Sequence, residues 1–241
     1  MTNFPKLDFS SGRNSLSGLA TINQELMKIG VRISILPLIA ESLEILTLST
    51  DKDYPLICQD QKDALLRFYA LDRPALLEQI ALAGRQPSVP RGGELVTAEK
   101  GVPAYPKIYD LRSMGVQGQV QAQFKFGRFH FNSSASGVGV DEVMTLVSGG
   151  PWTWFFANVR EGEMMKLTLG YVQSSLGAIR LSYPGLNPHG AFMRSMPMTD
   201  GSEGGLCIAH IHGPGEWLMQ YADVGDNPWC DFTDSSRPVL L

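Results

Sequence analysis

Two histidines and a glutamate stand close together near the end of the chain, in the stretch CIAHIHGPGEW of residues 207–217. His210 and His212 are two residues apart, and Glu216 follows the second after a Gly-Pro-Gly turn. Residues two apart on a β-strand point to the same side, so both imidazoles could bind one metal ion. The alternative is a pair of histidines near a strand end that only form hydrogen bonds or face solvent. The sequence leaves the role of Glu216 open.

Glu142 and His189 are two further residues of types that bind metal ions, and each lies near a turn that contains glycine. In DEVMTLVSGG, Glu142 precedes Gly149 by seven positions, and in LSYPGLNPHG, His189 follows Pro184 by five. These stretches resemble the two conserved segments of the cupin family, small β-barrels of the jelly-roll type. The resemblance implies a jelly-roll barrel that, in many members, holds a divalent metal ion such as iron, manganese, zinc or nickel.

The resemblance carries only Glu142 and His189 over by position. The histidines that the family places shortly before the glutamate are absent, since residues 136–138 are Ser-Gly-Val. Catalytic metal sites use about three or four protein ligands, so the missing ones are expected from the later histidine pair. The predicted metal ligands are therefore Glu142, His189, His210 and His212.

His130 is the remaining histidine, since the chain has four. On a strand it would point away from its neighbours Phe129 and Phe131. It is either a histidine facing solvent or a neighbouring strand, or a ligand that replaces the absent pair.

Other chemistries have weaker support in the sequence. The chain lacks the G-x-S-x-G turn of many serine hydrolases, and Cys207 lies three residues before His210, which puts the two on opposite faces of a strand. Glu161 and Glu163 are more typical of an exposed hairpin turn than of an acid–base pair. Trp154, in the alternating stretch GPWTWFF, either packs in a core or stacks on a flat ligand.

Helical spacing of apolar residues dominates the first 90 residues. A helix-turn-helix reading is disfavoured, because the fourth predicted helix exposes Glu78 and has one basic residue, Arg85, near its end. The four helices are predicted at 15–29, at 37–48, after an Asp60 cap, and after an Asp72 cap with Pro74 in the first turn.

Period-two alternation dominates the rest of the chain and predicts many short strands. The fold class is therefore mainly β: a cupin-like jelly-roll barrel over residues 91–241, preceded by an α-helical N-terminal segment over 1–90. The strands are expected at 94–98, 120–131 with a bulge at Gly127, 142–147, 152–157, 164–171, 178–182, 191–196, 205–211 and 217–222.

Composition limits the function classes. The formal net charge is −4 and no long basic run occurs, which disfavours a nucleic-acid partner. Three cysteines are too few and odd in number for a disulfide framework, which favours a reducing, cytoplasmic location. The most apolar window contains three charged residues and a proline, so no membrane span is expected, and no signal peptide is visible.

Two functional hypotheses follow. The first is a metal-dependent enzyme of the oxygenase, isomerase or lyase type that acts on a small organic molecule. The second is a metal-free barrel that binds a small molecule or has a structural role. In either case the partner is a small-molecule ligand, and a homodimer formed through edge strands is a further expectation.

Overall fold

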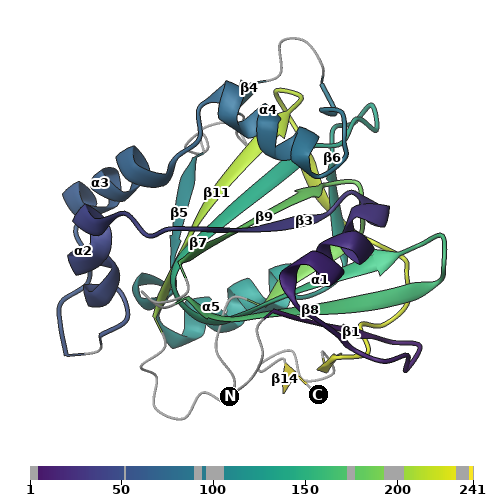
Figure 1. Cartoon of the computed structure of the whole chain (residues 1–241), viewed down its shortest axis with the longest axis horizontal. Coiled ribbons are helices and arrows are strands. Elements are labelled where there is room, and N and C mark those ends of the chain that lie inside the picture. The colour runs from purple at the N-terminus through teal and green to yellow at the C-terminus, as the bar shows by residue number, and fades with distance from the viewer. Residues whose placement is uncertain are drawn as a thin grey trace.

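The computed structural model describes residues 5–51, 53–89, 94–95, 106–172, 177–192, 204–231 and 239–240. The fold is mainly β, with one large antiparallel sheet and helices around it (Figure 1). The sheet contains β1 (Lys6–Phe9), β2 (Leu16–Ser17), β3 (Arg32–Leu36), β4 (Glu94–Leu95), β5 (Lys107–Asp110), β6 (His130–Ser133), β7 (Asp141–Asn158), β8 (Glu163–Val172), β9 (Ala178–Pro184), β10 (His189–Phe192), β11 (Gly205–Gly213) and β12 (Leu218–Tyr221). A separate pair consists of β13 (Cys230–Asp231) and β14 (Val239–Leu240).

The longest strand, β7, bends and thereby divides the sheet into two halves. Its first half pairs with β9 and β11, and its second half pairs with β8 and β10. The bend falls at Gly149 and Gly150, whose φ angles are 72° and 125°. Side chains disfavour such angles, and a Cβ on Gly149 would lie 2.1 Å from the carbonyl oxygen of Gly204. Glycine is therefore required where the sheet folds over.

Inward-facing side chains of both halves form the main core. The alternating aromatic residues Trp152, Trp154 and Phe156 are all buried in it, which confirms the core-packing interpretation for Trp152 and Phe156, whereas Trp154 also lines a cavity. They pack with Leu167 from β8 and Leu181 from β9. Burying such large apolar side chains stabilises each by about 1.5–3 kcal/mol relative to exposure.

The helices of the first 90 residues are α1 (Leu19–Leu26), α2 (Leu43–Leu48), α3 (Gln59–Tyr69) and α4 (Arg73–Leu82), with 3-10 turns η1 (Met27–Ile29) and η2 (Ala40–Ser42). Leu46 of α2 and Leu65 of α3 pack on Leu206 and Ile208 of β11, on the side away from the main core. The predicted Asp72 cap is confirmed, because its side chain accepts a hydrogen bond from the Ala75 N–H. The third helix begins earlier than predicted, with Cys58 at its N-cap.

The N-terminal segment also contains strands that the sequence did not predict. β1 pairs with β8, and β3 pairs with β9. The helices are therefore attached to the sheet by strands of the same segment. None of the helices described is both long and apolar enough to cross a membrane.

The prediction of a strand at 120–131 is wrong over most of its length. The helix α5 (Leu111–Phe126) occupies this part, with an interruption at Gly115, and only β6 follows it as a strand. Asp110 caps the helix by accepting from the Ser113 N–H. Gln119 and Gln123, one helical turn apart, are its buried side chains in this region, so the alternation of apolar residues did not reflect the buried face.

The predicted closed barrel is also corrected. Among the described residues, the pairing runs from β12 through β6, β10, β7, β8 and β1 to β2 without returning to its start. The bend in β7 brings the two halves over each other and leaves their edges open. The other predicted strands are present, although 142–147 and 152–157 are parts of one strand. The predicted residues 96–98 and 193–196 lie outside the described residues.

Candidate functional site

A cavity of about 420 Å³ lies between the two halves of the sheet. Its wall is mostly apolar and aromatic, with a small number of polar groups, which is typical of sites for small organic molecules. The polar and charged side chains that line it are Lys107, Lys125, His130, Asn132, Glu142, Tyr183 and His189.

Glu142 of β7 and His189 of β10 meet in this cavity. The His189 Nε2 atom lies 3.4 Å from the Glu142 Oε1 atom, and both side chains are buried. His189 pairs with Phe156 in the second half of β7. On a straight strand, Phe156 and Glu142 would be about 45 Å apart at about 3.3 Å per residue. The bend in β7 therefore brings the glutamate and the histidine together.

The Glu142 carboxylate is held by two donors. The Asn132 amide donates to Oε1 at 2.7 Å, and the Tyr183 hydroxyl donates to Oε2 at 3.1 Å. Burial by itself raises the pKa of Glu142, but the adjacent His189 and the Asn132 hydrogen bond outweigh burial, so this pKa lies below its ordinary value. Burial raises the pKa of Tyr183 well above its ordinary value, so its hydroxyl stays a donor.

The two imidazoles in the cavity are each held through Nδ1 by a backbone carbonyl. Nδ1 of His130 lies 2.8 Å from the Arg128 carbonyl oxygen, and Nδ1 of His189 lies 2.8 Å from the Asn187 carbonyl oxygen. A carbonyl only accepts, so Nδ1 carries the proton and a neutral ring keeps its lone pair on Nε2. Burial, and next His189, lower the pKa of His130 to about 3, so this ring is neutral at pH 7.

His130 and Asn132 also line the cavity; the sequence left His130 open as a ligand and gave Asn132 no role. They stand two apart on β6 and share a face. The His130 and His189 rings lie side by side, with centroids 4.4 Å apart. The signal available in the sequence was the spacing His-x-Asn on the strand before Glu142.

The structure does not bring His210 and His212 to Glu142 and His189. Ile211 pairs with Glu142 and lines the cavity, so its two neighbours on β11 point to the opposite face. There the His210 Nε2 atom accepts a hydrogen bond of 2.9 Å from the Leu71 N–H, between α3 and α4. The predicted group of four ligands is therefore not formed.

His212 lies in a buried polar group on the same outer face. Its Nδ1 atom is 4.0 Å from the Asp141 carboxylate, which also receives the Ser88 N–H and lies 3.4 Å from the Arg85 guanidinium. The positive Arg85 beside Asp141 makes this group a poor place for a metal cation. Glu216 is exposed on the turn after β11.

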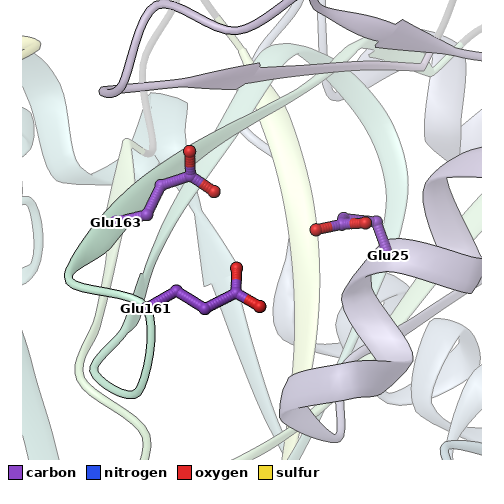
Figure 2. Close-up of side chains that lie close together, drawn as sticks. All are labelled: Glu25, Glu161 and Glu163. Atoms are coloured by element: carbon purple, nitrogen blue, oxygen red, sulfur yellow. The ribbon is translucent and has the colours of Figure 1, made fainter.

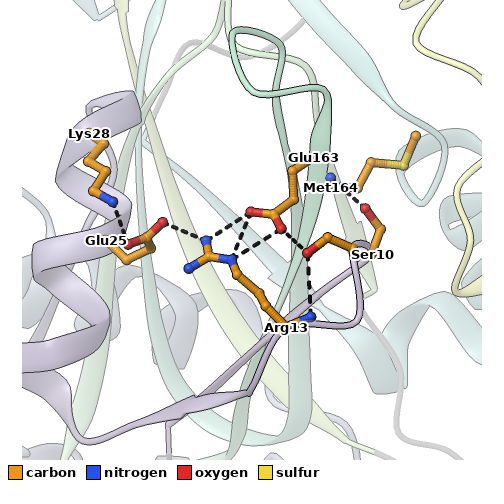
Figure 3. Close-up of polar contacts among 7 residues, drawn as sticks. Ser10, Arg13, Glu25, Lys28, Glu163 and Met164 are labelled. Carbon is orange, nitrogen blue, oxygen red and sulfur yellow. Dashed lines mark hydrogen bonds and ion pairs between the residues drawn. The ribbon is translucent and has the colours of Figure 1, made fainter.

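Three glutamates form a second cluster, away from the cavity. Ligand atoms of Glu25, Glu161 and Glu163 lie within 4.8 Å of one another (Figure 2). Figure 3 shows the Arg13 guanidinium between two of them, with hydrogen bonds of 2.6 Å to Glu25 and 2.8 Å to Glu163. Lys28 pairs with Glu25 as well. Arg13 and Lys28 balance the two buried carboxylates, Glu25 and Glu163, which are therefore explained by ion pairing, whereas Glu161 is exposed. Glu161 is exposed in the β7–β8 turn, as the sequence indicated, whereas Glu163 is the first residue of β8 and is buried.

The cavity site is less compact than that cluster. Within the described part of the chain, the Glu25 cluster is the only group of three or more such side chains whose ligand atoms all lie within 4.8 Å. Glu142 and His189 are in contact, but His130 is not within that limit of both. A metal ion that binds all three would draw His130 inward.

The folded sheet with a cavity between its halves is a cupin-like fold. A solved structure with a similar fold is the acireductone dioxygenase from Bacillus anthracis, which holds a cadmium ion in its active centre. The two align with a TM-score of 0.55 over 92% of this chain and 100% of that chain, at 13% sequence identity. This likeness shows the fold alone. No family model and no curated protein sequence matches the chain.

Proposed function

We propose that the chain is a metal-dependent enzyme that acts on a small organic molecule bound in the cavity. The contact between Glu142 and His189 carries the proposal. A carboxylate oxygen and a ring nitrogen that keeps its lone pair are both acceptors, and they face each other at 3.4 Å. The His189 Nε2 atom is buried and has no hydrogen-bond partner. With a neutral His189 ring these are two buried acceptors that need a cation between them, and a proton on Nε2 would make an ion pair there; we propose that a metal ion takes this place.

A divalent metal ion fits this donor set. Two ligands at about 2.1 Å from one ion are about 3.0–3.4 Å apart, which matches the observed separation. His130 would supply a second imidazole, and two histidines with one carboxylate form a common site for iron that leaves positions open. The Asn132 Oδ1 atom, buried without a partner, adds a further oxygen beside it. Iron, manganese, zinc and nickel all accept such ligands.

The chain's own groups have defined roles in this proposal. The Arg128 and Asn187 carbonyls fix the two imidazoles, and Asn132 and Tyr183 fix the carboxylate. The apolar wall excludes water from the bound molecule. The metal would polarise an oxygen of the substrate or bind dioxygen. The metal ion in the active centre of the acireductone dioxygenase of similar fold also supports this proposal.

Metal analysis of the purified protein tests the proposal. We expect about one equivalent of iron, manganese, zinc or nickel, as isolated or after incubation with each ion. His189→Ala and Glu142→Gln should lose it, and His130→Ala should weaken it by about 10–100-fold. Glu161→Gln, which removes a carboxylate from the other acidic cluster, is the matched control and should retain the metal.

Catalysis is tested separately by mass spectrometry of a small-molecule extract incubated with the metal-loaded protein. A compound that wild type consumes and Glu142→Gln does not would support an enzyme. Protein that stays metal-free after every incubation would contradict the proposal. The second candidate function is a metal-free binding protein, for which metal-free protein after every incubation is the expected result. It is favoured by the position of His130, which is not close to both Glu142 and His189.

A further inference from the structure

We propose that the cavity selects a small organic anion whose acidic group is held by Lys107 and Lys125. Calling this anion a substrate rests on the proposed function. The preference of the cavity for a negatively charged molecule rests on the cavity alone.

The two lysines lie on one wall of the cavity. Lys107 is in β5, and its Nζ atom is 5.2 Å from the centre of the Tyr109 ring. Lys125 is near the end of α5, and its Nζ atom is 5.3 Å from the centre of the Phe126 ring. The two rings meet edge to face, with centroids 6.2 Å apart. The ammonium groups are thus placed along one continuous aromatic wall, which stabilises them but does not neutralise them.

Neither ammonium forms an ion pair with a carboxylate of the described residues. The cavity lining, as far as it is described, contains one acidic side chain, Glu142, which is already held by Asn132 and Tyr183 and contacts His189. Five basic side chains elsewhere have carboxylate partners within 4.0 Å, whereas Arg112 and Arg180 donate to uncharged oxygens: the five are Lys6, Arg13, Lys28, Lys62 and Arg85.

A positive wall is unusual in this chain, because its formal net charge is −4. The overall field repels anions, so two uncompensated ammonium groups beside one cavity are a local feature that attracts them. Among the described residues that line the cavity, Lys107 and Lys125 are the two lysines, and no arginine lines it.

The same wall leads from the lysines to the proposed reactive end. The Phe126 ring lies 6.2 Å from the His130 ring, which in turn lies 4.4 Å from the His189 ring. An elongated molecule can therefore place its acidic group at the lysines and its other end beside Glu142. The body of the molecule would be apolar, because the remaining wall includes Met144, Ala191, Ile211 and Met219.

Calorimetric titration with matched acids and amides tests this inference. The probes are 3-phenylpropanoate against 3-phenylpropanamide and hexanoate against hexanamide, which differ in charge but hardly in shape. At pH 7.5 we expect the wild type to bind each acid about fivefold or more tightly than its amide. Lys107→Met and Lys125→Met should each reduce this preference, and the double variant should abolish it. Lys107→Arg should keep it, and so should Lys6→Met, a lysine remote from the cavity.

Each titration is repeated after dialysis against a chelator, because a bound metal ion would itself attract an acid. A preference that survives chelation and disappears in the double variant supports the inference, even if metal analysis has refuted the proposed function. A preference that depends on metal and not on the lysines overturns the inference and leaves the proposed function standing. Equal binding of acid and amide, or no binding of any acid, also overturns it.

Discussion

Replacing His210 by glutamine separates a structural histidine from a metal ligand. The imidazole is completely buried, and its Nε2 atom accepts the Leu71 N–H at 2.9 Å. This hydrogen bond holds the loop between α3 and α4 against β11. A glutamine has an acceptor oxygen of similar reach, so it can keep the bond, but it has no group that titrates. His210→Ala would instead leave the N–H unpaired and a cavity behind, at about 2–4 kcal/mol.

The size of the effect follows from the pKa of His210. Burial, and next the Arg180 guanidinium, lower this pKa to about 4, from about 6.5 in the unfolded chain. The unfolded state therefore binds more protons between pH 6.5 and pH 4, so stability falls as the pH falls through that window. At pH 4.5 the loss from this one ring is about 2.5 kcal/mol, whereas above pH 6.5 it is absent.

Urea unfolding at pH 7.5 and pH 4.5, followed by tryptophan fluorescence, measures the effect. At pH 7.5, His210→Gln should be less stable than wild type by about 1 kcal/mol, because the new hydrogen bond and packing are imperfect. At pH 4.5 the wild type should have lost about 2.5 kcal/mol more than the variant. The order of stability should then reverse.

His130 also has a lowered pKa, but it is present in both proteins, so its effect cancels from the difference. Equal losses between the two pH values would refute the assignment of His210 as a buried neutral ring. A variant that folds normally but loses bound metal, while His189→Ala retains it, would refute the placement of the metal site in the cavity.

Two further substitutions test the ion pairs and the bend. In Arg13→Met, we expect a loss of about 1–2 kcal/mol at pH 7, because the exposed guanidinium joins two largely buried carboxylates. Burial opposes it, but ion pairing holds the pKa values of Glu25 and Glu163 below their ordinary values. Their contribution is present above about pH 4.5 and is lost as the pH falls through the lowered folded-state pKa values, so the two urea curves should approach each other as the pH falls below about 4.5. In Gly149→Ala, a Cβ would lie 2.1 Å from a backbone oxygen, so unfolding measurements should show a loss of about 3 kcal/mol or more. Gly137→Ala shares the positive φ without any neighbour within 4 Å and should lose only about 1–2 kcal/mol.

Local signals were sufficient for several elements. The Asp72 cap followed by Pro74 predicted the start of α4, because a capping side chain and a fixed φ act within one turn. Alternation predicted β8 and β9 to within two residues at either end. The turn-associated Glu142 and His189 were predicted as a pair, and they lie in contact.

The sequence did not indicate which side chains of the central strands face the core. Every residue of β11 is buried, and so is nearly every residue of β7. A strand covered on both sides loses the alternation that would mark its inner face. His210 and His212 therefore looked equally able to face the core or the helices. The choice depends on the pairing of Ile211 with Glu142, which is a long-range contact.

The absent histidines of the cupin-like pattern are best explained by the connection between β6 and β7. His130 and Asn132 lie on the inner face of β6, and a turn closed by the hydrogen bond from the Ser134 N–H to the Val138 carbonyl separates them from Glu142. Lengthening a surface turn costs little, since closure entropy grows slowly with length. Shifting a side chain by one position on a strand, in contrast, moves it to the other face. Spacing across the turn can therefore vary while His130 and Asn132 keep facing the cavity, so a search at a fixed spacing before Glu142 does not find them.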